Sequence, residues 1–276
     1  MKAKTALISG GSSGVGLSLV KALAKENYNV FFIGSNKEKG MKIEHELRTV
    51  HSEKIEFIQL DLSDLNPVKL FADDFIRKNE SLDLLVCSAG VVIPKRTETI
   101  DGLEKTFSIG YLSAYLLSKE LLPILSKPEN SRILFVSGSR SIALKFRLNY
   151  SNLNFVRYYN GFMVAGKTVH AKAVLADILS TKYASKNIDV NAFSPGMVKS
   201  DLTRNLTFPL NYIMKYLSIL SPKSSKTGVR ASIDSSMLGV TGKFIDTFKQ
   251  TPLMFDESYK DQLTYETESM LSGILN

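Results

Sequence analysis

Short apolar runs alternate with helix-like segments along most of this chain. The strand-like runs cover residues 5–9, 30–33, 55–60, 82–87, 132–137, 188–193 and 242–245. The segments with apolar residues at helical spacing cover residues 15–25, 37–50, 67–78, 103–125 and 163–184. Strands that are separated by helices pair in parallel and are covered on both faces. The pattern therefore predicts an α/β fold, a doubly wound parallel sheet in a three-layer α/β/α arrangement.

The alternation also predicts how the chain is divided. No linker, repeat or low-complexity tract interrupts it, and 276 residues with 44% hydrophobic content are enough for one sizeable core. We therefore expect a single domain over residues 1–276. Two stretches depart from the pattern, residues 138–162 and 200–227, and both follow the carboxyl end of a predicted strand. Open α/β sheets bind ligands at this edge, so we expect both insertions to be functional.

Composition narrows the classes of protein that fit. The single cysteine, Cys87, argues against a disulfide scaffold and a multi-cysteine metal site, and it suits a reducing compartment. The first ten residues lack a signal-peptide pattern, and no apolar run is long enough to cross a bilayer. The net charge of +8 is dispersed rather than gathered in a basic run. We expect a cytoplasmic protein with no metal site and no nucleic-acid partner.

A glycine-rich turn joins the first predicted strand to the first predicted helix. Its sequence is Ser9-Gly10-Gly11-Ser12-Ser13-Gly14-Val15-Gly16. Glycines let the backbone turn tightly and approach a pyrophosphate, and the start of the next helix offers free N–H groups and a positive dipole. This context predicts a dinucleotide site that includes Gly10, Ser12, Ser13, Gly14, Val15 and Gly16.

The turn resembles the TGxxxGxG fingerprint of the short-chain dehydrogenase/reductase family, with Ser9 in place of threonine. Four further segments are similar to that family and to its retinol dehydrogenase-like and protochlorophyllide reductase-like branch: 60–62, 82–90, 99–107 and 194–202. In residues 82–90 (LDLLVCSAG), Cys87 and Ser88 replace two asparagines of the family pattern. The resemblance covers nearly the whole chain. It implies further cofactor contacts from Asp61, Leu62, Ser88, Ala89, Gly90, Pro195, Gly196, Val198 and Ser200.

The end of the second predicted strand bears on the choice between NAD and NADP. An acidic residue at this point of a Rossmann-type fold binds the ribose 2′-hydroxyl of NAD. Here no acid stands before Glu38. The residues that can instead hold a 2′-phosphate, by hydrogen bonds and one positive charge, are Ser12, Ser35, Asn36 and Lys37. We therefore expect NADP rather than NAD as the cofactor, together with a small-molecule substrate.

The resemblance also implies a catalytic tetrad. In the family, a tyrosine is the general acid/base, a lysine four residues later lowers its pKa and holds the nicotinamide ribose, a serine orients the substrate, and an asparagine supports a proton relay. The lysine matches Lys167, which puts Met163 at the tyrosine position. The serine position is then Gly138, 25 residues earlier, and the asparagine position is Gly110. A thioether cannot donate a proton, so the standard mechanism cannot run through Met163.

Neighbouring residues are candidates for the missing roles. Ser139 follows the serine position and can supply a hydroxyl if the strand has ended there. The phenols of Tyr158, Tyr159 and Tyr111 are candidate proton donors. His170 shares a helix face with Lys167, although a buried structural histidine is the simpler interpretation.

A second register of the same helix stays open. It takes Lys172 as the lysine and Thr168 as the tyrosine position. This choice gives up the 25-residue spacing between Gly138 and the tyrosine position. It also makes the sequence separation between the lysine and Pro195 shorter than is usual in this family. Neither register places a tyrosine four residues before a lysine.

Residues 206–220 are apolar apart from Lys215 and predict a lid over a lipophilic substrate, within the insertion at about 200–227. Such a lid is compatible with weak contact to a membrane surface. We expect an NAD(P)-dependent oxidoreductase that acts on a carbonyl, an alcohol or an activated C=C bond with an atypical proton donor. The loss of three catalytic side chains leaves an alternative, a catalytically degenerate NADP-binding sensor or interaction protein. Assembly into a homo-oligomer stays open.

Overall fold

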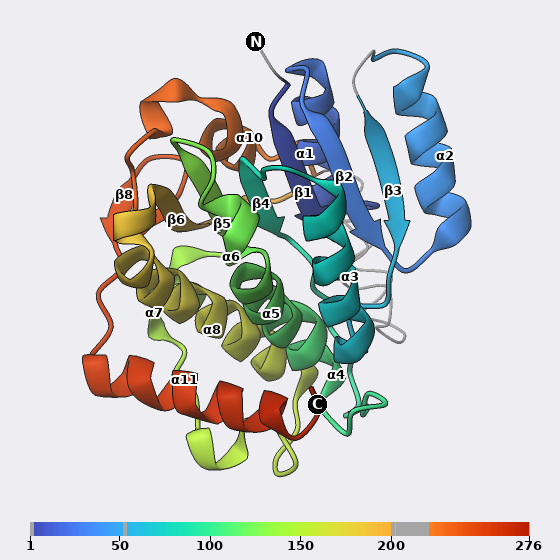
Figure 1. Cartoon of the computed structure of the whole chain (residues 1–276). Helices are drawn as coiled ribbons and strands as arrows, with labels where there is room; N and C mark the ends of the chain where they lie inside the picture. Colours follow the sequence, from blue (N-terminus) through green and yellow to red (C-terminus); the bar gives the residue numbers. More distant parts are fainter. Residues whose placement is uncertain (1–2, 52–53, 200–201, 203–220, 276) are drawn as a thin grey trace.

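The computed structural model describes residues 3–51, 54–199, 202 and 221–275. In these residues the molecule is built on one sheet with the strand order β3-β2-β1-β4-β5-β6-β7-β8 (Figure 1). The strands are β1 (Thr5–Ser9), β2 (Asn29–Gly34), β3 (Ile55–Gln59), β4 (Leu84–Cys87), β5 (Ser131–Val136), β6 (Ile188–Phe193), β7 (Lys243–Ile245) and β8 (Gln250–Pro252). Neighbouring strands pair in parallel except β7 and β8, which are antiparallel.

Helices cover both faces of this sheet. They are α1 (Gly14–Lys25), α2 (Lys37–Arg48), α3 (Leu65–Lys78), α4 (Lys105–Phe107), α5 (Ser113–Glu120), α6 (Leu122–Leu125), α7 (Arg140–Lys145), α8 (Gly161–Lys182), α10 (Lys226–Ile233) and α11 (Glu257–Ser272). Residues of α1, α2 and α10 share one apolar cluster with the sheet, and residues of α3, α5, α8 and α11 share the other. The predicted three-layer α/β/α fold is confirmed.

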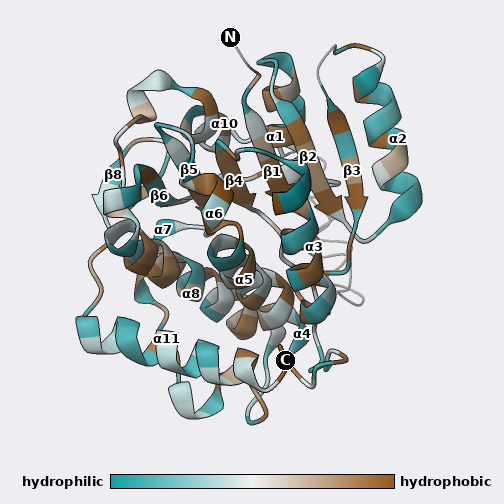
Figure 2. Ribbon diagram, viewed as in Figure 1, coloured by the Kyte–Doolittle hydropathy of each residue, from teal (hydrophilic) through white to brown (hydrophobic). Residues whose placement is uncertain are grey.

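Successive side chains of the inner strands point to opposite faces of the sheet and so belong alternately to the two apolar clusters. On β1, Ala6 and Ile8 join the cluster under α1, whereas Leu7 joins the cluster under α8. Figure 2 shows the result, because the central strands are largely hydrophobic while α2 and α11 carry hydrophilic stretches. The chain leaves β1 for β2 on one side and later returns to β4 on the other side. This reversal creates a crevice at the carboxyl ends of β1 and β4.

Two predicted features differ in the structure. The single helix expected over 103–125 is divided into α4, a π-helical turn η1 (Ser108–Leu112), α5 and α6. Pro123 lies in the first turn of α6. A proline there lacks only an N–H that has no partner within the helix, so a new helix can begin at this point and α6 is separate from α5. Second, α11 was not expected, because it buries only Lys260, Leu263, Thr267 and Leu271 and so lacks an apolar stripe.

The predicted lid falls largely outside the described residues, which leave out 200–201 and 203–220. The last residues of the predicted insertion belong to α10, which begins at Lys226. Among the described helices, none combines the length and the apolar character that a membrane span requires.

Candidate active site

A cavity of about 550 Å³ opens at the carboxyl ends of the strands. Its wall comes from the turn after β1, the ends of β2 and β3, the loop after β4, the α4–η1 segment, the end of β5, helix α8 and the loop after β6. The predicted cofactor residues at this wall are Gly10, Ser12, Ser13, Gly14, Val15, Gly16, Ser35, Asp61, Leu62, Ser88, Ala89, Gly90, Pro195, Gly196 and Val198. Ser200 lies outside the described residues.

The glycine turn is shaped to leave room for a ligand. Gly10 has a φ of +68°, and a Cβ there would lie 2.8 Å from the backbone of Ala89. A Cβ on Gly16 would lie 2.3 Å from the Gly10 carbonyl oxygen. The N-cap of α1 is Ser13, whose side chain makes no capping hydrogen bond. The first N–H groups of α1 are therefore available to a phosphate, and these residues fit a dinucleotide pyrophosphate.

The two departures from the family pattern at Ser9 and Ser88 support each other. The Ser88 hydroxyl donates to the Ser9 carbonyl oxygen at 2.6 Å, and the Ala89 N–H donates to the Ser9 hydroxyl at 3.3 Å. These bonds join the carboxyl ends of β1 and β4, on the two sides of the crevice. The substituted hydroxyls thus hold the turn and the β4 loop at a fixed separation.

At the predicted adenosine end, the structure brings only two of the four expected residues to the cavity wall. Ser12 and Ser35 lie at the wall, and Ser12 packs beside Gly34 at the end of β2. Asn36 does not line the cavity, since its side chain accepts from the Lys39 N–H at 2.8 Å and caps α2. Lys37 begins α2, is exposed and also does not line the cavity. The side chain of Asn36 is used by its own helix, so Ser12 and Ser35 remain as the polar groups there.

The other half of the cavity is formed where the α4–η1 segment meets α8. Gly110 and Gly138 both lie at the wall, as predicted for the asparagine and serine positions. A Cβ on Gly110 would lie 2.5 Å from Cγ2 of Thr168, so the two helices are in close contact there. Thr168 and Lys172, four residues apart on one face of α8, also line the cavity.

Lys172 is the charged group of this half of the wall. Its side chain is 4% exposed, and it makes no hydrogen bond or ion pair with any described residue. Burial lowers the pKa of Lys172 to about 8. Cys87, at the end of β4, lies nearby, and burial raises the pKa of its thiol to about 12. Cys87 is therefore a neutral neighbour, and Lys172 can change its charge near neutral pH.

The geometry can now be set beside known proteins. The model of the family described as short chain dehydrogenase matches residues 4–152. The chain belongs to the short-chain dehydrogenase family. It is 24% identical to polyprenol dehydrogenase of Homo sapiens, over 99% of this chain and 86% of the relative. It is 26% identical to retinol dehydrogenase 14 of Mus musculus, over 100% of this chain and 87% of the relative.

A solved structure gives the fold comparison. The Pseudomonas aeruginosa RhlG/NADP active-site complex superposes with a TM-score of 0.65 and 20% identity, covering 88% of this chain and 94% of that chain. The family motifs of the sequence and the observed strand order thus agree with a known fold.

Within this short-chain dehydrogenase, the structure places the two residues of the first register, Lys167 and Met163, outside the cavity lining. Lys167 does not line the cavity, and its ammonium lies 5.9 Å from the centre of the Phe155 ring. Met163 is 47% exposed and is also away from the cavity. Lys167 and Lys172 are five residues apart, about 140° around a helix, so they cannot share a face. Packing of Gly110 against Thr168 turns the Lys172 face inward.

The neighbouring candidates also lie away from the cavity wall. Ser139 is exposed, with its hydroxyl 3.1 Å from that of Ser141. Tyr158 is 97% exposed. Tyr111 is buried with its hydroxyl 2.8 Å from that of Thr267, and burial raises its pKa. His170 is fully buried and structural, as the simpler interpretation predicted.

Tyr159 is the candidate phenol that comes closest to the site. Its hydroxyl lies 2.8 Å from the Ile93 carbonyl oxygen and 3.0 Å from Glu104. Neither Tyr159 nor Glu104 lines the cavity, but Thr106 does, and sequence reasoning missed it. Thr106 lies four residues before Gly110, on the same side of the α4–η1 segment. This four-residue spacing from the asparagine position is the sequence signal that could have identified Thr106 as a cavity residue.

Proposed function

We propose that this protein is an NADP-dependent oxidoreductase that interconverts a lipophilic aldehyde and its alcohol, with Lys172 as the proton donor. The observation that carries the proposal is that one cavity is lined both by the glycine turn and by the buried Lys172. A carbonyl or an activated C=C bond is the wider class of acceptor that this arrangement serves. The aldehyde is favoured because relatives of this chain are named for retinol and polyprenol, which are alcohols.

NADP is favoured by the end of β2 and by the comparison of structures. Ser12 and Ser35 offer hydroxyl groups there, and among the described residues Asp61, two residues after β3, is the carboxylate that lines the cavity. A structural neighbour with the same fold holds NADP. When bound, NADPH supplies the hydride for the reduction.

Lys172 is favoured as the proton donor because the family's other acid/base groups have no counterpart at the wall. Gly110 and Gly138 have no side chains, and the Thr168 hydroxyl already donates to the Val164 carbonyl oxygen at 2.8 Å. As the carbonyl carbon gains a hydride, the Lys172 ammonium gives one proton to the carbonyl oxygen. The resulting amine then takes a proton from water, which restores the starting charge.

The wall of this half supports a lipophilic substrate. Apart from Thr106, Thr168, Lys172 and Ser221, the described residues that line the cavity outside the glycine turn, the ends of β2 and β3 and Ser88 are apolar or glycine. They include Val91, Ile109, Val136, Ala165, Val169, Met197 and Leu202. An aldehyde with a long hydrocarbon chain matches this surface better than a polar sugar.

The test compares two lysines of α8 by NADPH-dependent reduction of all-trans-retinal and decanal. Lys172→Met should lower kcat/KM by about 100-fold or more, since it removes the general acid. The matched variant Lys167→Met should keep the wild-type value. For wild type, the rate of reduction should fall as pH rises through about 8, because the ammonium is lost, and alcohol oxidation should rise over the same range.

Two results would overturn the proposal. Equal activity of Lys172→Met and wild type would remove Lys172 from the reaction. The second is tight NADPH binding, measured by NADPH fluorescence, together with no turnover of any aldehyde, ketone or enone. That result would support the alternative, a nucleotide-binding protein without catalysis.

A further inference from the structure

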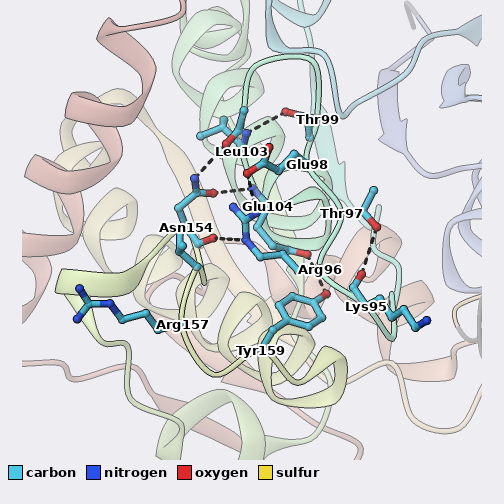
Figure 3. Close-up of polar contacts among 12 residues, drawn as sticks. Lys95, Arg96, Thr97, Glu98, Thr99, Leu103, Glu104, Asn154, Arg157 and Tyr159 are labelled. Atoms are coloured by element: carbon cyan, nitrogen blue, oxygen red, sulfur yellow. Dashed lines mark hydrogen bonds and ion pairs between the residues drawn. The ribbon is translucent and has the colours of Figure 1, made fainter.

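A group of polar residues lies behind the cavity wall and has no part in the chemistry proposed above (Figure 3). At its centre is Glu104, which is 1% exposed. One carboxylate oxygen accepts from the Phe107 N–H at 2.7 Å, and the other accepts from the Thr106 N–H at 3.0 Å. The Tyr159 hydroxyl lies 3.0 Å from the second oxygen. Glu104 thus holds the first turn of α4 and Tyr159 together.

The loop before α8 is tied to the loop before α4 by Asn154. Its side-chain oxygen accepts from the Glu104 N–H at 2.6 Å, and its side-chain nitrogen donates to the Gly102 carbonyl oxygen at 3.0 Å. The Arg96 Nε donates to the Asn154 carbonyl oxygen at 3.2 Å. Figure 3 shows Asn154, Glu104 and Tyr159 gathered around one point. These bonds fix the position of Thr106, the residue that follows in α4.

Thr106 is the member of this group that reaches the cavity. It is 1% exposed and lines the wall, yet its hydroxyl makes no hydrogen bond of normal length and angle with the described residues. Burial raises the pKa of Tyr159 to about 12, Glu104 adds to the rise, and the neighbouring Thr106 hydroxyl opposes it as a weak hydrogen-bond partner of the phenol. Buried polar groups nearly always make a full hydrogen bond, so a hydroxyl at a cavity wall with only this weak contact points to a ligand as its main partner.

The position of Thr106 along the wall favours the substrate over the cofactor. Gly110 follows Thr106 by one helical turn and contacts Thr168, and Lys172 follows Thr168 by one turn. Thr106 and Lys172 therefore both lie within one helical turn of the Gly110–Thr168 contact, in the part of the wall where the α4–η1 segment meets α8. There, Thr106 carries the one wall hydroxyl of the described residues that makes no hydrogen bond of normal geometry.

We propose that Thr106 hydrogen-bonds the oxygen of the aldehyde or alcohol substrate, and that Glu104 and Tyr159 are positioning residues that hold it. The inference rests on the proposed function and specifies its substrate site. It assigns to Thr106 the orienting role for which Gly138 and Thr168 have no free hydroxyl. The class of ligand is a lipophilic molecule with one terminal carbonyl or hydroxyl group.

The test uses two substitutions of Thr106 and a matched control. Thr106→Val keeps the shape and removes the hydroxyl, and Thr106→Ser keeps the hydroxyl. Ser137→Ala is the control, because Ser137 is also buried with an unpaired hydroxyl but does not line the cavity. The measurements are kcat/KM for all-trans-retinal with NADPH, calorimetric binding of all-trans-retinal to the NADP⁺-saturated protein, NADPH affinity and Tm.

Thr106→Val should lower kcat/KM roughly tenfold and weaken retinal binding, as expected for one lost hydrogen bond. NADPH affinity should not change, and Tm should hold or rise, since the variant removes an unpaired buried hydroxyl. Thr106→Ser and Ser137→Ala should behave like wild type. Wild-type retinal binding and kcat/KM in Thr106→Val would overturn the proposal.

The positioning role is tested by a double-mutant cycle. Tyr159→Phe should lower kcat/KM a few-fold in wild type and have no further effect in Thr106→Val, because it acts through Thr106. Equal effects in both backgrounds would exclude that role. The retinal–NADP⁺ pair does not react, so a Thr106-dependent binding signal survives even if turnover is absent. The proposed function can therefore fail separately from this inference.

Discussion

At the residue scale, the chemistry available where the α4–η1 segment meets α8 depends on which catalytic side chains are missing and which remain. Gly110 and Gly138 add only backbone to the wall, and Thr168 uses its hydroxyl within α8. Lys172 is then left in a buried position without a partner among the described residues, and burial lowers its pKa to about 8. The same burial that would destabilise a charged lysine makes this one a suitable acid near neutral pH.

Restoring a phenol tests the register of α8. Thr168→Tyr should raise the rate of aldehyde reduction by about 10- to 100-fold, because Thr168 lines the cavity and the phenol then lies one helical turn from Lys172. Met163→Tyr is the matched variant at an exposed position and should leave the rate unchanged. Steady-state reduction of all-trans-retinal measures both. A gain from Met163→Tyr alone would restore the register through Lys167.

At the element scale, α11 depends on a few buried polar contacts because it lacks an apolar stripe. Its residue Tyr259 accepts from the Leu148 N–H at 2.8 Å and donates to Nε2 of His170 at 2.9 Å. Nδ1 of His170 donates to the Ala143 carbonyl oxygen at 2.8 Å, because a carbonyl can only accept, and burial lowers the pKa of the ring to about 4, so the neutral ring carries its proton on Nδ1. His170 therefore joins α7, α8 and α11 in one hydrogen-bonded chain.

This chain predicts acid sensitivity. Burial lowers the pKa of His170 to about 4, below its usual value of about 6.5, so the unfolded chain binds more protons between these values. Stability should therefore fall as pH falls from about 6.5 to about 4, by about 2 kcal/mol at pH 5. Urea unfolding of wild type and His170→Gln at both ends of this range measures the effect. An equally steep fall in His170→Gln would place the acid sensitivity elsewhere.

At the scale of the whole molecule, the cavity connects the two halves of the chain. The turn after β1 and the loop after β4 form one side, while α8 and the loop after β6 form the other. Both halves share the same sheet and the same two apolar clusters. A ligand that spans the cavity should therefore stabilise the domain as one cooperative unit.

We therefore expect NADPH to raise the Tm of the protein and the thermal unfolding to remain a single transition. At about 100 times its Kd the ligand adds about 2.7 kcal/mol, which corresponds to roughly 5 °C in Tm for a domain of this size. Ser35→Asp is the control, because a carboxylate at the end of β2 repels a 2′-phosphate and accepts the 2′-hydroxyl of NADH. That variant should respond to NADH and lose its response to NADPH. Scanning calorimetry that resolves two transitions would argue against one cooperative unit.

Local sequence patterns were enough to predict β1 to β7, most of the long helices and their order along the chain. Residues 5–9 and 188–193 were placed as strands with the bounds that the structure has, and the glycine turn predicted the phosphate end of the cavity. These features depend on local spacing, since apolar periodicity and glycine chemistry act within a few residues. The lack of a standard tyrosine–lysine pair was also readable from spacing alone.

Only the tertiary structure decided which face of α8 meets the cavity. Helical spacing fits Lys167 and Lys172 equally well, and the close contact of Gly110 with Thr168, far apart in sequence, turns Lys172 inward. The docking of α11 through His170 and the unpaired hydroxyl of Thr106 arise in the same way. Local periodicity sets what an element is, whereas its orientation depends on long-range packing, which no local pattern in one sequence encodes.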